Sequence, residues 1–205
     1  ARVKNEALAS LKKANYKAYG NEKYVRYLFD ENFSQAIWLY FAYGFLIKKK
    51  EDKDLISAIN IEIDQVKDNL FNILSFLYDT RTIIKAREVF LTNINEKQAN
   101  ALEIIDNLVS RRMSSRFALI LEDLDIDERL SKLDGFKSFD FKNDKGFILM
   151  SILQKAEKHY NRWTQVVAIQ GLQQETAGNG ALELLIPFVN SHEKIIRESA
   201  CFAIN

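Results

Sequence analysis

Residues 55–77 carry apolar side chains at steps of three and four residues, and this spacing limits the possible folds more than any other feature. The apolar positions are Leu55, Ile59, Ile63, Val66, Leu70, Leu74 and Leu77. Residues at this spacing share one face of an α-helix, whereas a half-buried strand needs strict alternation. The segment therefore predicts one amphipathic helix of about 35 Å.

Glycine and proline are scarce, with seven Gly and one Pro among 205 residues. Because strand-rich folds need these residues in their many turns, the composition favours helices joined by short connections. Residues 21–48 are expected to form one or two helices that end at the charged run 48–53. After residue 78 the patterns shorten. They predict helices at 81–91, 96–110, 112–123, 126–133, 146–159, 161–173, 180–190 and 192–204.

Short helices in series raise the question of an internal repeat. Residues 163–172 align with residues 195–204 at an offset of 32 positions, which pairs small residues with small ones where two helices would touch. A polar turn, an apolar residue, an Arg and an Ala also follow one another from residue 190 to residue 200, as in the second helix of a HEAT repeat. The expected repeat positions are Trp163, Ala168, Gly171, Leu172, Arg197, Ala200 and Ala203.

These patterns predict an all-α fold, with a HEAT-like helical-repeat array, or α-solenoid, over residues 79–205. Residues 1–78 are expected to form longer helices that pack on this array as part of one continuous structural unit. The alternative is an ordinary helical bundle in which the small residues coincide by chance. Helix starts are expected at Asp79, Asn95 and Ser191, because such side chains accept hydrogen bonds from the first turn.

The net charge and the cysteine content indicate which partners and which cellular compartment are expected for the chain. Lys and Arg total 29 and Asp and Glu 28, so the net charge of +1 gives no global attraction to nucleic acid or to an anionic bilayer. Cys201 has no second cysteine to pair with and is expected as a small buried apolar residue in a reducing, cytoplasmic setting.

The longest apolar run, residues 36–47, covers only about 18 Å as a helix and is too short to span a bilayer. No signal-peptide pattern opens the chain. The first residue is not Met and the last residues continue a helical pattern, so the chain is expected to be part of a longer protein.

Catalytic and metal-binding motifs fail on inspection, so the chain is expected to be non-enzymatic, with no catalytic residue, metal or cofactor. His159 and His192 are the two histidines, and a zincin motif opening at His192 meets Ile196 where the second His belongs. Residues 178–180 resemble half of a dinucleotide fingerprint, but Glu183 replaces its last Gly.

Residues 123–127 have the spacing of the first calcium ligands of an EF-hand loop. Glu128 stands where that loop needs Gly, and Asp134 stands where it needs Glu. Capping of a helix by Asp125 or Asp127 is the preferred interpretation.

Arg111, Arg112 and Arg116 form the most concentrated arginine cluster and are the candidate interaction patch. Arg112 and Arg116 lie four residues apart and share one helix face, so they could grip a phosphate or a carboxylate. The alternative is a solvated face that pairs with Glu122 or Asp123.

Three functional hypotheses remain open. The first is a scaffold that presents a curved helical face to a protein partner or to a neighbouring domain. The second is a helical-repeat nucleic-acid binder that adds Arg162 to the arginine cluster, against which the near-neutral charge counts. The third is a small-molecule sensor with an apolar pocket among Trp38, Tyr40 and Phe41.

A resemblance to a known family adds to the first hypothesis. Its quoted segments are Leu74-Ser75-Phe76-Leu77-Tyr78-Asp79, Ala86-Arg87-Glu88, Ala101-Leu102-Glu103-Ile104-Ile105-Asp106-Asn107-Leu108, Leu121-Glu122-Asp123-Leu124 and Asp127-Glu128-Arg129-Leu130. In their order and spacing they resemble the soluble HEAT-like region that follows the membrane helices of bacterial ATP/ADP-type nucleotide translocases. Residues 118–121 lack the Pro that this family often has there.

The resemblance implies a scaffold or regulatory region attached to a transporter, with a protein or a neighbouring domain as partner and no nucleic acid. It implies a cytoplasmic location, at the cytoplasmic face of the bacterial inner membrane where the segment is tethered, and no membrane span within the segment. It transfers no ligand-binding residue to this chain.

Overall fold

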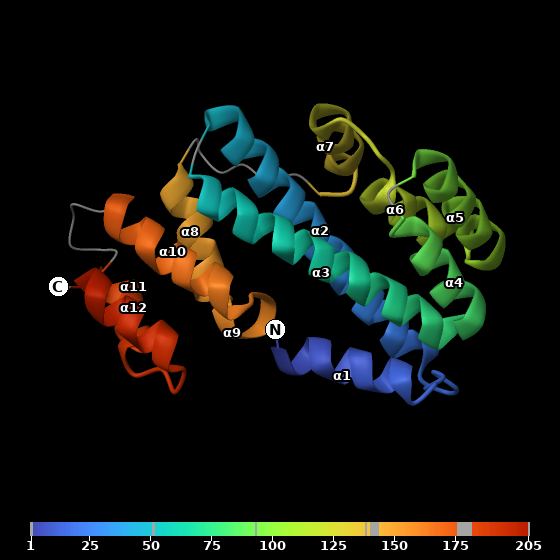
Figure 1. Cartoon of the computed structure of the whole chain (residues 1–205), viewed down its shortest axis with the longest axis horizontal. Coiled ribbons are helices and arrows are strands. Elements are labelled where there is room, and N and C mark those ends of the chain that lie inside the picture. Colours follow the sequence, from blue (N-terminus) through green and yellow to red (C-terminus); the bar gives the residue numbers. More distant parts are fainter. Residues whose placement is uncertain are drawn as a thin grey trace. The chain divides into compact units, whose positions relative to one another are not determined.

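The structure is a computed structural model that describes residues 2–50, 52–92, 94–137, 139, 144–175 and 182–204. All regular secondary structure in these residues is helical, which confirms the predicted all-α class. Figure 1 shows the helices in chain order: α1 (Arg2–Lys13), α2 (Glu22–Lys49), α3 (Lys53–Leu77), α4 (Thr80–Phe90), α5 (Asn95–Leu108), α6 (Arg111–Leu121), α7 (Ile126–Asp134), α8 (Lys145–Gln154), α9 (Ala156–His159), α10 (Arg162–Glu175), α11 (Leu182–Val189) and α12 (Lys194–Ile204).

The chain divides into two compact units, and each is described by itself. Unit 1 comprises Ala1–Lys4, Phe41–Glu62 and Phe139–Asn205. Unit 2 comprises Asn5–Tyr40 and Ile63–Ser138. Both units contain residues from either side of position 78, and the two longest helices, α2 and α3, contribute residues to each.

The amphipathic helix predicted for residues 55–77 is confirmed as α3, which begins two residues earlier. Six of its seven predicted apolar positions are buried, and Leu77 at the end is half-buried. Residues 21–48, expected as one or two helices, form the single helix α2. The apolar spacing therefore identified both the helices and the face that each buries.

Phe117 of α6 lies at the centre of unit 2. Its ring packs edge-to-face on Phe71 of α3, with 4.9 Å between ring centroids, and lies 6.5 Å from the ring of Phe29 of α2. Phe29 and Phe117 are completely buried. One aromatic side chain therefore joins three helices, a contact that contributes through burial and through the ring geometry.

Two predicted helix caps are confirmed in unit 2. The Asp79 carboxylate accepts the Thr82 N–H at 2.8 Å at the start of α4. Asp125 accepts the Asp127 N–H at 2.8 Å before α7, which is the capping role preferred over calcium binding.

The predicted start of α5 is corrected by one position. Asn95 is already the first helical residue, so the cap position falls on Ile94, which has no side-chain hydrogen bond to offer. At α12, the Ser191 hydroxyl accepts the Glu193 N–H at 3.2 Å, and the helix begins at Lys194.

The prediction of a single helix at 146–159 is wrong, because the chain turns at Lys155, between α8 and α9. The side-chain amide of Gln165 donates to the backbone oxygens of Ala156, at 3.2 Å, and Tyr160, at 3.0 Å. These bonds satisfy carbonyls of a short helix that has few internal ones. A residue of a later helix thus stabilises the break, which local periodicity does not reveal.

In unit 1, α10 packs on α8 and on α12. Gly171 of α10 faces Leu149 of α8 so closely that an added Cβ would lie 3.1 Å from a Leu149 methyl carbon. The small residue at this predicted repeat position therefore permits the close approach of two helices.

A larger side chain at this contact is expected to destabilise the fold. Gly171→Val should lower the free energy of unfolding by about 2 kcal/mol, because its methyl groups would overlap Leu149 in a packed core. Urea-induced unfolding followed by circular dichroism gives the value. Gln170→Val is the matched control, since the neighbouring residue is exposed and should change stability little.

Candidate functional site

The predicted arginine cluster has two exposed members and one half-buried member. Arg111 and Arg112 are exposed at the start of α6. Arg116 instead forms an ion pair with Asp30 of α2, with 2.6 Å between Nη1 and Oδ1. Its guanidinium carbon also lies 5.4 Å from the ring centroid of Phe33. Arg116 thus holds α6 to α2, with Asp30 in place of the expected Glu122 or Asp123.

Arg26 of α2 lies at the start of α6 and was not expected there. Its Nη1 atom approaches the Met113 sulfur at 3.2 Å, and Met113 directly follows the two exposed arginines. The Tyr78 hydroxyl lies 3.8 Å from the same sulfur and accepts the Ser110 N–H at 3.2 Å. Arg26 is distant from α6 in sequence, so no local pattern could have grouped them.

The Tyr78 hydroxyl, which contacts Ser110 and Met113, has a shifted pKa. Burial raises the pKa of its hydroxyl, but hydrogen bonds with Ser110 and the positive charge of Arg26 outweigh burial, so the pKa lies below its usual value. Opposite charge close to a phenol stabilises the phenolate. Arg26 therefore contributes to the lowered pKa of Tyr78, after the hydrogen bonds with Ser110.

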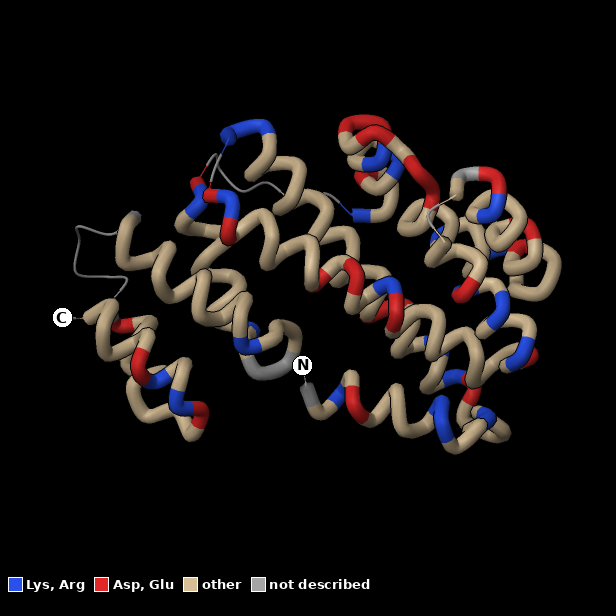
Figure 2. Tube along the Cα trace, in the orientation of Figure 1, with Lys and Arg blue, Asp and Glu red and all other residues tan. Residues whose placement is uncertain are grey.

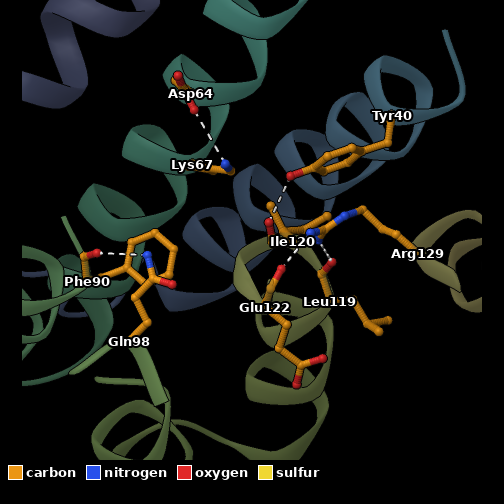
Figure 3. A network of polar contacts seen from close by, with 9 residues as sticks. All are labelled: Tyr40, Asp64, Lys67, Phe90, Gln98, Leu119, Ile120, Glu122 and Arg129. Carbon is orange, nitrogen blue, oxygen red and sulfur yellow. Dashed lines mark hydrogen bonds and ion pairs between the residues drawn. The ribbon is translucent and has the colours of Figure 1, made fainter. Parts of the chain in front are cut away.

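The side chains of Tyr40 and Arg129 meet at the other end of α6 (Figure 3). The Arg129 guanidinium donates to the backbone oxygens of Leu119 and of Glu122, the latter at 2.5 Å. It also lies 4.6 Å from the ring centroid of Tyr40, whose hydroxyl donates to the Ile120 oxygen at 2.9 Å. These bonds satisfy the free carbonyls that end a helix.

The residues proposed for a sensor pocket lie mostly inside the protein. Trp38 is 7% exposed and Tyr40 is 6% exposed. Phe41 is half-buried. Tyr40 is engaged in the contacts with Arg129 and Ile120, so its ring and its hydroxyl both have a structural role.

Glu62 of α3 is a buried carboxylate that the sequence analysis missed. It is 1% exposed, and its Oε1 atom accepts the Asn161 N–H at 2.6 Å and the Thr164 hydroxyl at 2.8 Å. Asn161 in turn caps α10 by accepting the Thr164 N–H at 2.9 Å. Burial raises the Glu62 pKa, and these two hydrogen bonds oppose the rise. The Glu62 side chain therefore joins α3 to the first turn of α10 through these two hydrogen bonds.

Large apolar side chains are exposed on two neighbouring helices of unit 1. Trp163 of α10 is 46% exposed, and Ile195 and Phe202 of α12 are 51% and 71% exposed. Ile195 and Phe202 lie seven residues apart and so share one face of α12. Trp163 and Ile195 occupy equivalent positions at the offset of 32 residues. We call this set the apolar α10–α12 face.

The other expected repeat positions are internal. Ala168 and Ala200 are fully buried, Leu172 is 1% exposed and Ala203 is 4% exposed. The Arg197 guanidinium donates to the Ser191 backbone oxygen at 2.7 Å. Cys201, expected to be buried, is half-buried.

Metal-ligating side chains and the fragment of a dinucleotide fingerprint were the chemical motifs considered in the sequence. No three His, Cys, Asp or Glu side chains among the described residues are placed to hold a metal ion. His192 is exposed ahead of α12. Residues 178–180, the fragment of a dinucleotide fingerprint, lie outside the described residues.

Comparisons with known proteins give no family. No family model, no curated protein and no solved structure matches this chain. Within the described residues, no helix has both the length and the hydropathy needed to cross a bilayer. The surfaces and contacts above are therefore the basis for any functional proposal.

Proposed function

We propose that this chain is a non-enzymatic helical-repeat scaffold that binds a protein partner or a neighbouring domain through the apolar α10–α12 face. The observation that carries the proposal is the exposure of Trp163, Ile195 and Phe202, each between 46% and 71% exposed. Grouped apolar side chains on a protein surface mark interaction sites, and aromatic residues are enriched there. Figure 2 shows that α10 carries few charged residues.

We further propose that α8 to α12 form two HEAT-like repeats, the pairs α8–α10 and α11–α12. The packing supports this: α8 packs on α10, α11 on α12, α10 on α12 and α8 on α11. Arg162, the first residue of α10, forms an ion pair with Glu193, which directly precedes α12, and Gln173 donates to the Phe202 oxygen at 3.5 Å near the ends of the two helices. The two equivalent helices therefore run parallel, as successive repeats do in a solenoid.

Scaffolding is favoured over nucleic-acid binding by the roles of the arginines. Arg116 pairs with Asp30 and Arg162 pairs with Glu193, so two of the four arginines named for the nucleic-acid hypothesis have acidic partners. A nucleic-acid backbone needs an extended row of free cations. Arg111 and Arg112 remain, and such a short cluster suits a compact ligand better than an extended nucleic-acid backbone.

We propose, on the sequence resemblance alone, that the scaffold belongs to a membrane nucleotide transporter of the ATP/ADP type and acts at the cytoplasmic face. Sequencing of the complete reading frame tests this part. Membrane-spanning segments encoded upstream in the same frame are expected, and a frame without them would refute the tether while leaving the binding face to its own test.

Adding charge to the apolar α10–α12 face is expected to abolish partner binding without unfolding the chain. Ile195→Asp with Phe202→Asp should reduce partner recovery at least about tenfold, because buried unpaired carboxylates oppose an apolar interface. Both residues are more than half exposed, so the circular dichroism spectrum should be unchanged. The measurement is quantitative mass spectrometry of proteins cross-linked to the full-length protein in its own cells.

Ala99→Asp with Asn100→Asp is the matched control, since it adds the same two charges at exposed positions of α5. This control should recover partners at the wild-type level. Equal loss with both double variants would point to net charge rather than the face. Unchanged recovery with the Ile195 and Phe202 variant would refute the proposal.

A further inference from the structure

Unit 2 carries a second surface, which is basic rather than apolar. It consists of Arg26 on α2 and of Arg111 and Arg112 on α6, and we call it the arginine triad. All three residues are exposed. None of them forms an ion pair with another described residue, and Arg26 contacts the Met113 sulfur at 3.2 Å and hydrogen-bonds the Tyr78 hydroxyl. A thioether and a phenol are neutral groups, so neither contact neutralises the charge of Arg26.

The start of α6 adds to this positive charge. A helix N-terminus carries a partial positive charge, and acidic residues there are favourable. The first turn of α6 has no acidic residue, and the cap residue Ser110 makes no side-chain cap hydrogen bond. Two arginines therefore occupy a position where a helix prefers carboxylates, so binding of an anion there would be favourable.

Acidic side chains of the same chain could neutralise the arginine triad. The Asp106 carboxylate lies at the first turn of α6, where it accepts the hydroxyl of Ser114, the fourth residue of the helix, at 2.7 Å. Hydrogen bonds with Ser110 and, after them, the hydrogen bond and charge of Arg26 hold the pKa of the Tyr78 phenol below its ordinary value, so Arg26 acts on a group at the start of α6. The three arginines outnumber the Asp106 carboxylate, so these groups together keep a net positive charge.

We propose that the arginine triad binds a phosphorylated segment of a protein partner. Guanidinium groups bind phosphate oxygens through paired, charge-assisted hydrogen bonds, and clusters of arginine are the usual recognition element for phosphopeptides. The triad is confined to the adjacent turns of two helices, which suits one or two phosphate groups rather than a long nucleic-acid backbone. This site is independent of the apolar α10–α12 face and does not rest on the function proposed above.

Fluorescence anisotropy tests the site with the full chain and a defined probe. The probe is a fluorescein-labelled Gly-rich peptide with two phosphoserines, and its unphosphorylated twin is the comparison. At about 50 mM salt the phosphopeptide should bind at least about tenfold more tightly than its twin, and higher salt should weaken it. Arg111→Ala with Arg112→Ala should reduce this affinity at least about tenfold, and Arg26→Ala should reduce it by a similar factor.

Arg81→Ala is the control, because Arg81 is an exposed arginine of α4 outside the triad and its loss should leave the affinity unchanged. Equal binding of both peptides, or unchanged binding by the triad variants, would overturn the proposal. The proposal would also be overturned if vesicles containing phosphatidylinositol phosphate, or single-stranded RNA, bound more tightly than the phosphopeptide and lost this binding in the triad variants. The natural ligand would then not be a protein segment.

Discussion

Replacing Arg129 by Ala is expected to lower the free energy of unfolding by about 3 kcal/mol. Arg129 is 7% exposed, and its guanidinium donates to the backbone oxygens of Leu119 and Glu122 at the end of α6. Without it, these carbonyls lose charge-assisted partners in a buried place and the Tyr40 ring loses the cation that covers it. Urea titration monitored by circular dichroism measures the loss.

Two further variants separate the parts of this network. Tyr40→Phe keeps the ring under Arg129 and removes only the hydroxyl that donates to the Ile120 oxygen, so a smaller loss of about 1 kcal/mol is expected. Ser131→Ala changes an exposed residue of the same helix, α7, and should match wild type. A loss for Arg129→Ala no larger than that of Ser131→Ala would show that the guanidinium does not stabilise the end of α6.

The helices could be predicted from the sequence because their cause is local. The step of three and four residues between Leu55 and Leu74 recurs along one helix face, and α3 buries that face. Asp79 and Asp125 cap helices through side chains that reach the next turn of the same chain segment. Each of these features depends only on residues close in sequence.

The candidate site was predicted only in part because its geometry depends on distant residues. Arg112 and Arg116 share a helix spacing, yet Arg116 is half-buried against Asp30 and Phe33 of α2. Arg26 takes its place beside the exposed pair because α2 packs on α6 through Phe29 and Phe117. Periodicity identifies a helix face, but the contents of the neighbouring helix decide which of its charges remain free.

The break at Lys155 and the burial of Glu62 were missed for the same reason. Gln165 satisfies the carbonyls around the break from a later helix, and the acceptor role of Glu62 appears only where α10 begins. A single Glu on a helix is ordinarily solvated. The described structure of unit 1 instead places it at a helix N-terminus with two hydrogen-bond donors.

Glu62 is expected to give the second large effect on stability. Glu62→Ala should lower the free energy of unfolding by about 3 kcal/mol, because it leaves the Asn161 N–H and the Thr164 hydroxyl without their acceptor and creates a cavity. Glu62→Gln keeps the shape and an acceptor oxygen, so it should retain most of the stability. Urea titration of the two variants beside wild type gives both values.

The comparison with Glu62→Gln also has a defined pH dependence. Burial raises the Glu62 pKa above its ordinary 4.5, so folding favours the protonated carboxyl. The stability from this shift is fully present below pH 4.5 and is lost as the pH rises through the higher folded pKa. Wild type should therefore lose stability relative to Glu62→Gln as the pH rises from 4.5 through the folded pKa of Glu62, in unfolding titrations repeated at increasing pH.

The control for this pH dependence is Glu103→Gln, a change at an exposed carboxylate of α5. Its stability should follow the wild-type profile at every pH, since that carboxylate stays in water in both states of the chain. If Glu62→Gln also follows the wild-type profile, burial does not govern the Glu62 carboxyl. A relative gain of wild type with rising pH would mean that the positive end of α10 and its two donors outweigh burial, and that the ionised carboxylate is the form that joins α3 to α10.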